Sequence, residues 1–327
     1  MAYGISLSRI SVLLAALMFG GCASLAFQQD VPRHAYVAGG EDEFDRYMPI
    51  VVSEHPDRSY NRIGRPEVTE DAEQVRLTIN PDMAVAYAEK RRFETDRAAY
   101  TNFIYRIHFE KVPFSLLPFN LTEGRNVGLL IVITLNERQQ PVLITTVHTC
   151  GCYMAMVPTN YLPEDAYPPH WDRQGQDVYG ASLPGLLKFD ATEKGEKFVI
   201  YLRDETHRVI HLDVASHDDV AARYDIQPLT VHPVAALDAL ELADSGARVS
   251  MFEPGGSRQD YVRDSHKPFE FLFMSWWSFD VRVGVDKRYG LPGGQGRVFY
   301  TSLKPWARRE SDMRDFPAFL RYWGWHL

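Results

Sequence analysis

The apolar residues of this chain fall into short runs of strand length, separated by polar and turn-forming residues. The clearest pair is 127–135, which is almost entirely aliphatic, and 142–147. The polar loop 136–141 separates the two runs. Neither run alternates cleanly between apolar and polar residues, which is typical of strands buried on both faces. The pattern therefore predicts an antiparallel hairpin in the interior of the protein.

Further runs extend this picture along the chain. Strands are predicted at 76–79 and 100–112, and a second hairpin at 197–213. Leucines and valines at helical spacing favour one short helix at 234–242. The predicted fold class is therefore α+β, mainly antiparallel β-sheet with a few helices.

The last predicted element is an amphipathic C-terminal helix. Its apolar face is formed by Phe316, Phe319, Leu320 and Trp323, which follow one another at helical spacing. Asp315 is placed to cap the helix, Pro317 suits its first turn, and Gly324 suits its end. We expect this helix to dock onto the domain; the alternative is a helix that faces a membrane or a partner.

The first twenty-two residues have the features of an export signal. Arg9 precedes an apolar run over residues 10–19, and Gly20, Gly21 and Cys22 follow. The run is about half of the roughly 20 residues that span a bilayer. This segment resembles the lipobox of bacterial lipoproteins, although Phe19 stands where a smaller aliphatic residue is usual. Plain secretion with a free Cys22, or a buried apolar helix, are the alternatives.

The resemblance implies a location in the bacterial cell envelope. In that family the signal, here residues 1–21, is removed and the cysteine that follows, here Cys22, is lipidated. The lipid would be the membrane attachment, with the bilayer as partner, because no second apolar run reaches spanning length. Aspartate after the lipidated cysteine often accompanies retention at the inner membrane. Ala23 occupies that position, so the resemblance favours the outer membrane, facing the periplasm.

Composition and charge bound the rest of the chain. We expect a flexible tether over residues 22–47 and a single globular, β-rich domain over 48–327, with a subdivision near 218–234 as an alternative. Apolar residues make up 45% of the sequence and charged residues 24%, which suits a domain with a packed core. The formal net charge of -8 gives no basic surface for nucleic acid, so nucleic-acid binding is not expected.

One segment concentrates metal-ligating side chains. At every second position it carries a candidate ligand: His148, Cys150, Cys152, Met154 and Met156. If the segment continues as a strand, these side chains share one face, and such ligands suit copper or zinc. Two alternatives stay open. Cys150 and Cys152 could form a disulfide, structural or active in thiol–disulfide exchange, or all of these side chains could simply pack in a core.

Aromatic residues mark a second candidate site. Tyr161, Tyr167 and Trp171 lie in a proline-rich loop, and Trp276 and Trp277 begin a tryptophan-rich tail. If exposed, these five residues form a surface for an envelope protein or polymer. We find no catalytic signature, which favours a protein that is not an enzyme and leaves catalysis on a small molecule as a further alternative. The sequence therefore favours a lipid-anchored envelope lipoprotein with a binding or structural role; the alternative is a copper- or zinc-handling or thiol-disulfide protein centred on His148, Cys150 and Cys152.

Overall fold

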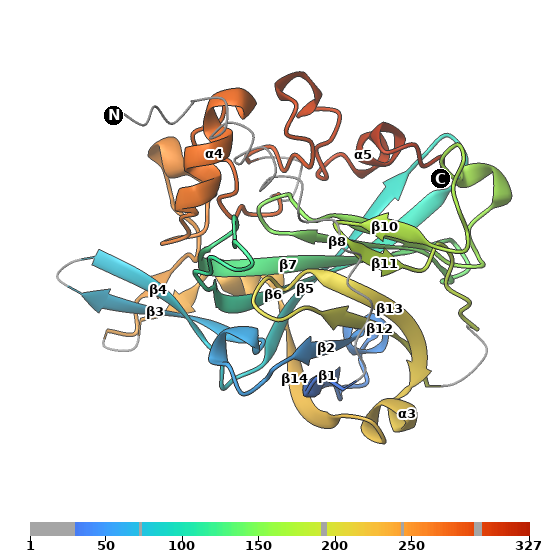
Figure 1. Ribbon diagram of the computed structural model, residues 1–327, viewed down its shortest axis with the longest axis horizontal. Coiled ribbons are helices and arrows are strands. Elements are labelled where there is room, and N and C mark those ends of the chain that lie inside the picture. Colours follow the sequence, from blue (N-terminus) through green and yellow to red (C-terminus); the bar gives the residue numbers. More distant parts are fainter. Residues whose placement is uncertain (1–29, 72–73, 191–194, 243–244, 291–295) are drawn as a thin grey trace, which may run out of the picture.

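The computed structural model describes residues 30–71, 74–190, 195–242, 245–290 and 296–327, so the signal-like segment and Cys22 lie outside the described residues. A ten-stranded sheet dominates the described part, in the order β13-β12-β2-β1-β14-β5-β6-β7-β8-β9 (Figure 1). Its strands are β1 (Arg33–Ala38), β2 (Ile50–Glu54), β5 (Val85–Glu94), β6 (Ala99–Val112), β7 (Gly124–Leu135), β8 (Pro141–His148), β9 (Ala155–Pro158), β12 (Glu196–Leu202), β13 (Val209–Ser216) and β14 (Asp225–Pro233).

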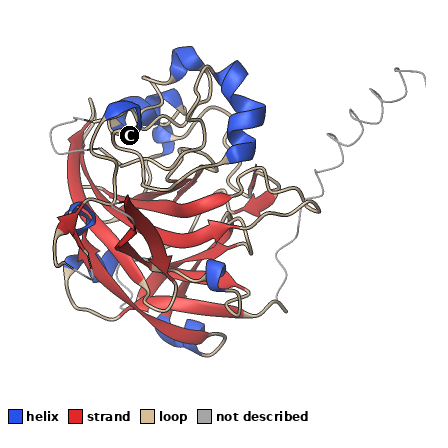
Figure 2. Ribbon diagram, turned by 90° about the vertical axis from the view of Figure 1, so that its left-hand side faces the viewer, coloured by secondary structure: helices blue, strands red, loops and turns tan. Residues whose placement is uncertain are grey.

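Smaller elements surround this sheet. The two-stranded pairs are β3 (Arg65–Asp71) with β4 (Gln74–Asn80), β10 (Gln176–Val178) with β11 (Ala181–Leu183), and β15 (Leu240–Glu241) with β16 (Arg248–Val249). The α-helices are α2 (Glu43–Tyr47), α3 (His217–Ala221), α4 (Pro268–Ser278) and α5 (Phe316–Tyr322). The 3-10 turns are η1 (Ser59–Asn61), η2 (Glu164–Ala166), η3 (Val234–Asp238), η4 (Gly256–Arg258) and η5 (Pro305–Ala307). The sheet is strongly curved, and α4 and α5 lie over the same side of it (Figures 1 and 2).

The predicted fold class is confirmed. Six of the nine neighbouring strand pairs in the large sheet are antiparallel. The other three pairs, β1 with β14, β2 with β12 and β5 with β14, are parallel. Both predicted hairpins are present, as β7–β8 and β12–β13.

The central strands are buried on both faces, as the run 127–135 predicts. On β7, Leu129, Ile131 and Ile133 belong to one hydrophobic cluster, which also contains the inward side chains of β1, β2 and β12. Leu130 and Val132 point to the opposite face and belong to a second cluster. This second face would meet water without a cover, and the C-terminal segment covers it.

The C-terminal helix α5 is part of that cover. The side chain of Asp315 accepts a hydrogen bond from the Ala318 backbone N–H at 3.1 Å, which is the predicted N-cap. Phe316, Phe319 and Leu320 are buried in the second cluster. The prediction that this helix docks onto the domain is confirmed.

The prediction of a flexible tether over residues 22–47 is wrong from Arg33 onward. Residues 33–38 form β1, which lies between β2 and β14 inside the sheet. Ala35 and Tyr36 are buried in the first cluster. The polar residues around this strand concealed it, because its partner residues 225–229 are far away in the sequence.

Two further expectations are corrected. The alternative subdivision near 218–234 falls on α3 and β14, and β14 pairs with both β1 and β5 in the middle of the sheet. The helix expected at 234–242 is the shorter 3-10 turn η3, followed by β15. A third hydrophobic cluster forms here, between the β3–β4 hairpin and residues 237–262.

Among the described residues, no helix combines the length and apolarity that crossing a membrane would require.

The position of β1 gives a direct test. Replacing Tyr36 with alanine should lower the free energy of unfolding by about 3 kcal/mol or more, because it removes a buried aromatic ring. Glu41→Ala, in the exposed part of the same N-terminal segment, should change it by less than about 0.5 kcal/mol. Urea denaturation of both variants measures the difference. Equal stability of the two variants would mean that residues 33–38 are not part of the folded sheet.

Candidate functional site

The candidate metal-binding segment is a turn and not an extended strand. β8 ends at His148 and β9 begins only at Ala155. Between them Gly151 has a φ of 92° and Tyr153 a φ of 50°, so the chain reverses. A Cβ on Gly151 would lie 2.1 Å from the Tyr300 carbonyl oxygen, so only glycine fits there. The prediction that five ligating side chains share one strand face is therefore wrong.

The two cysteines of this turn are joined. Cys150 and Cys152 form a disulfide, with their Cα atoms 5.6 Å apart. The ligating atoms of His148, Cys150 and Cys152 lie within 4.8 Å of one another. Met154 and Met156 instead pack against the second hydrophobic cluster. The structure thus brings three of the five predicted ligands together, and two of these three are held in the disulfide.

Buried charges lie directly against the disulfide turn. The Lys287 ammonium group donates a hydrogen bond to the Cys150 carbonyl oxygen. Lys267 forms an ion pair with Asp286, with 3.3 Å between Nζ and Oδ2, and both side chains are fully buried. The Thr149 hydroxyl donates to Asp286, and so does the Ser265 hydroxyl at 3.0 Å. This network fixes the turn against the segment that follows α4.

Burial and neighbouring charges together determine the protonation of the groups around the turn. It lowers the pKa of His148 well below its usual value, and repulsion from Lys267 lowers it further. Burial also lowers the pKa of Lys287, to about 8. For Lys267 burial acts in the same direction, but attraction to Asp286 and Glu270 raises the pKa overall. His148 is therefore neutral at pH 7 beside a lysine that stays charged.

This arrangement favours a structural crosslink over metal handling. Copper(I) and zinc bind cysteine as the thiolate, and the disulfide must be reduced before thiolates exist. The neighbouring lysine ammonium groups would also repel a metal cation. Cys150 is buried and Cys152 is half-buried, so an exchange partner has access only to the Cys152 side of the bridge.

The aromatic residues of the proline-rich loop support the core. Trp171 packs edge-to-face on Trp325, with 4.8 Å between ring centroids, and its indole N–H donates to the Gly185 carbonyl at 2.7 Å. Tyr161 and Tyr167 also pack against the second cluster. These three residues are half-buried and hold the C-terminal segment in place; they do not form the open surface that the sequence predicts.

The two tryptophans at the start of the tail, unlike the residues of the proline-rich loop, are exposed. Trp276 keeps 74% of its surface exposed and Trp277 keeps 40%. They belong to a larger apolar surface, which we call the aromatic surface. Its members are Phe114, Leu116, Leu117, Phe119, Phe271, Leu272, Phe273, Trp276, Trp277, Phe279 and Val281.

The aromatic surface joins α4 to the loop 113–119. Phe119 contacts both Phe269 and Phe273 of α4, with ring centroids 5.1 Å and 6.2 Å apart. Phe114 lies 5.8 Å from Phe269 by the same measure. Leu117, at the tip of the loop, is 93% exposed. Sequence reasoning missed this loop, although seven uncharged residues with two phenylalanines and two leucines between strands are an unusual composition for a surface loop.

Helix α4 has reversed polarity: it buries polar side chains and exposes apolar ones. Its buried residues are Glu270 and Ser278, whereas Phe271, Leu272, Phe273, Trp276 and Trp277 are exposed. The Glu270 carboxyl group lies against Gly284, where a Cβ would be 1.3 Å from Oε2. Burial raises the pKa of Glu270, and the nearby Lys267 opposes this shift. The helix thus turns its one acidic side chain toward the buried lysines and leaves its apolar side chains in water.

The disulfide makes a prediction about thiols and metals. The chain from Ala23 onward should show no reactive thiol when denatured without reductant and two after reduction, because Cys150 and Cys152 are bridged. Zinc and copper titrations should then show no tight, fixed-ratio binding at the turn in the oxidised protein. The matched controls are Cys150→Ser and Cys152→Ser. Stoichiometric binding by the oxidised chain that both variants abolish would contradict this interpretation.

A second prediction concerns His207, whose carbonyl oxygen lies 3.1 Å from His148 Nε2. Its ring stacks on Phe109, and burial lowers its pKa to about 4. Between pH 6.5 and 4 the unfolded chain binds a proton here and the folded chain does not. The free energy of unfolding therefore falls by about 1.4 kcal/mol for each unit by which the pH is lowered. Between pH 7 and 5 the native chain should therefore lose about 2 kcal/mol more than His207→Gln in urea denaturation. The same loss in both would refute a neutral, buried His207.

No protein-family model, curated protein or solved structure matches this chain.

Proposed function

We propose that this protein is an exported envelope lipoprotein, anchored through an acylated Cys22, whose folded domain binds the surface of the bilayer through the aromatic surface. The signal-like segment with its lipobox-type cysteine supports export and anchoring. In line with Ala23, the outer membrane facing the periplasm is the proposed location. The observation that carries the binding role is the reversed polarity of α4.

The exposed residues suit a bilayer interface. Tryptophan and other amphipathic aromatic residues concentrate where the hydrocarbon meets the headgroups. The loop 113–119 contains no charged residue, and the only charged residue of α4, Glu270, is buried. These two segments could therefore enter the interface without dehydrating a charge, and Asp280, which follows them between Phe279 and Val281, accepts a hydrogen bond from the Tyr300 hydroxyl.

The gain from such insertion is large enough to matter. Fully burying a phenylalanine, leucine or similar side chain is worth about 1.5–3 kcal/mol relative to leaving it in water. Leu117, Leu272, Trp276 and Phe279 are each at least 60% exposed in the folded protein. Even partial insertion of these four side chains would supply several kcal/mol.

The proposed anchor keeps the folded domain close to the membrane. Ten residues lie between Cys22 and Arg33 of β1, and the eleven steps from one to the other span at most about 40 Å when the chain is fully extended. The lipid would thus hold the domain at a high effective concentration next to the bilayer. A weak contact through the aromatic surface would then be enough to set the orientation of the domain.

Vesicle binding by the unlipidated chain tests this proposal. The chain from Ala23 onward should sediment with phosphatidylethanolamine/phosphatidylglycerol vesicles, and its tryptophan emission should shift to the blue. Trp276→Ser combined with Leu117→Ser should reduce the partition coefficient at least tenfold, which corresponds to about 1.4 kcal/mol. Tyr179→Ser, at an exposed aromatic residue outside the aromatic surface, is the matched control and should bind as the native chain does.

Two results would count against membrane binding. One is no binding of the native chain to vesicles at any lipid concentration tested. The other is an unchanged partition coefficient in the double variant. In either case the aromatic surface would have to be assigned to a protein or polymer of the envelope.

A further inference from the structure

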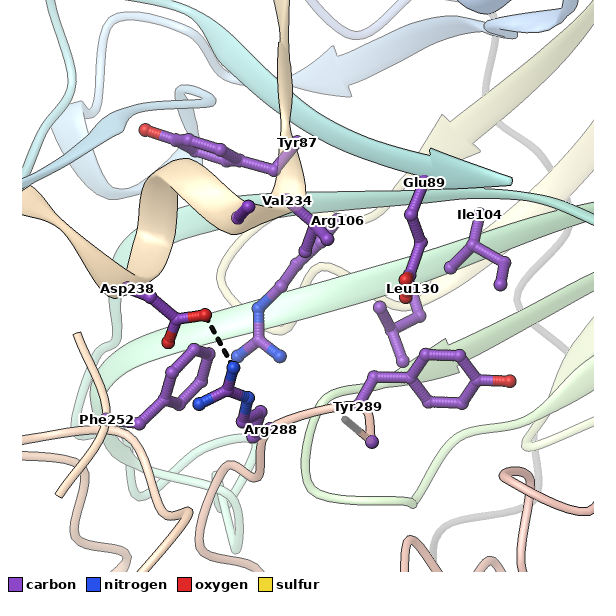
Figure 3. A pocket seen from close by; sticks show the side chains of 12 residues that line it. Tyr87, Glu89, Ile104, Arg106, Leu130, Val234, Asp238, Phe252, Arg288 and Tyr289 are labelled. Atoms are coloured by element: carbon purple, nitrogen blue, oxygen red, sulfur yellow. Dashed lines mark hydrogen bonds and ion pairs between the residues drawn. The ribbon is translucent and has the colours of Figure 1, made fainter. Parts of the chain in front are cut away.

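A cavity of about 110 Å³ lies on the face of the sheet opposite to the first hydrophobic cluster, between β5, β6, β7, η3 and residues 288–290. Its walls are largely apolar and include Ile104, Leu130, Val234 and Phe252. One water needs roughly 10–15 Å³ of such space, so the cavity has room for a small molecule. Figure 3 shows two guanidinium groups, those of Arg106 and Arg288, close together in it.

Arg106 is a buried cation with an unused donor. Its side chain is 2% exposed. Its Nε donates to His108 Nε2 at 2.8 Å, and its Nη1 donates to the Lys287 carbonyl oxygen at 2.8 Å. Its third nitrogen, Nη2, has no hydrogen-bond partner in the described structure. A buried guanidinium nitrogen without a partner costs free energy, so this group is suited to receive an acceptor.

Each of the other charged side chains that line the cavity has an ion-pair partner. Arg288 forms an ion pair with Asp238, with 2.5 Å between Nη2 and Oδ2. Glu89 pairs with Arg91 at 2.7 Å. Arg106 takes part in none of the ion pairs of the described residues, and the carboxylate that favours its charged form is Asp286, which makes no ion pair with it. One positive charge is therefore left over in this part of the interior.

The guanidinium groups of the two arginines also repel each other. Both guanidinium groups lie over the Phe252 ring, at 5.3 Å and 5.2 Å from its centroid. Burial lowers the pKa of Arg106 to about 10, and repulsion from Arg288 contributes in the same direction. An anion between the two groups would relieve this repulsion and accept hydrogen bonds from the free N–H groups of Nη2.

We propose that this cavity binds a small organic carboxylate, with its carboxylate group on Arg106 and its apolar part against Ile104, Leu130 and Val234. A carboxylate matches the planar guanidinium fork. The apolar walls favour a ligand with a short aliphatic or aromatic part over a fully hydrated ion such as phosphate. This proposal is independent of membrane binding, because the aromatic surface contributes no residue to the cavity.

Calorimetric titration of the full-length chain in lipid nanodiscs tests it, with benzoate and butyrate as probes. Both acids should bind, whereas benzamide, butyramide and inorganic phosphate should bind at least tenfold more weakly. Saturating benzoate should also raise the melting temperature. Arg106→Gln should abolish the binding of both acids and the shift in melting temperature.

A second variant covers the case in which Arg106→Gln fails to fold. Ala235→Phe places a larger side chain at an exposed position that lines the cavity, and it should weaken benzoate binding at least tenfold while the fold is kept. Ala222→Phe, at an exposed alanine after α3 that does not line the cavity, is the matched control and should bind as the native chain does. No binding of either acid at millimolar concentration would overturn the proposal. So would equal binding of acid and amide, tighter binding of phosphate, or full binding by either Arg106→Gln or Ala235→Phe.

Discussion

The burial of β6 and β7 on both faces is the constraint on which the rest of this structure depends. These strands pair over most of their length, and their side chains alternate between two sides of the sheet. On one side Phe103, Tyr105 and Ile107 pack into the first hydrophobic cluster. The other side must be covered as well, because uncovered aliphatic side chains in the middle of a sheet would expose a large apolar area. The chain after β14 provides this cover, so the C-terminal part is a structural requirement of the sheet and not an appendage to it.

The covered face is apolar at one end and polar at the other, and this division explains the buried charges. Ile104 of β6 lies in the second cluster, but Arg106 and His108, two and four positions further on the same face, are buried and polar. The segment over them brings Lys267, Asp286 and Lys287 into the interior. Among these groups and Glu270 there are three cations and two carboxyl groups. The surplus of one positive charge is the physical reason why an anion would stabilise the cavity beside Arg106.

The buried lysines also account for the orientation of α4, which directs its acidic side chain inward. Two buried lysines need negative charge nearby, and Glu270 is the acidic side chain of α4 that can face them. A helix has one orientation, so directing Glu270 inward directs Phe271, Leu272 and Trp276 away from the interior. The exposed aromatic surface is then a consequence of how the interior is charged. It leaves several large apolar side chains in water, which a soluble monomer rarely does without a binding role.

Local patterns predicted what depends on neighbouring residues and failed where distant ones decide. The β7–β8 hairpin, the β12–β13 hairpin and α5 were predictable because each carries its signal within about 20 residues of sequence. Residues 33–38 form a short run among polar residues, and their strand pairs with residues 225–229, which are far away in the sequence. The metal-ligand spacing around Cys150 assumed an extended chain, and the contact between Gly151 and Tyr300 that reverses it is invisible in the sequence. The exposure of Trp276 depends on the inward turn of Glu270, which no helical periodicity reveals.

The disulfide is best understood as a local clamp within this arrangement. Because Cys150 and Cys152 are two positions apart, the bridge closes a very short loop and removes little conformational freedom from the unfolded chain. The loop-closure relation gives about 1.6 kcal/mol for three residues, against about 3 kcal/mol for fifteen. Its larger effect is on geometry, since it fixes the turn in which the Cys150 carbonyl oxygen accepts from Lys287 and the Thr149 carbonyl oxygen accepts from the Lys287 backbone N–H at 2.8 Å. The bridge thus holds Lys287 in place, and the carbonyl oxygen of that residue in turn orients the guanidinium group of Arg106.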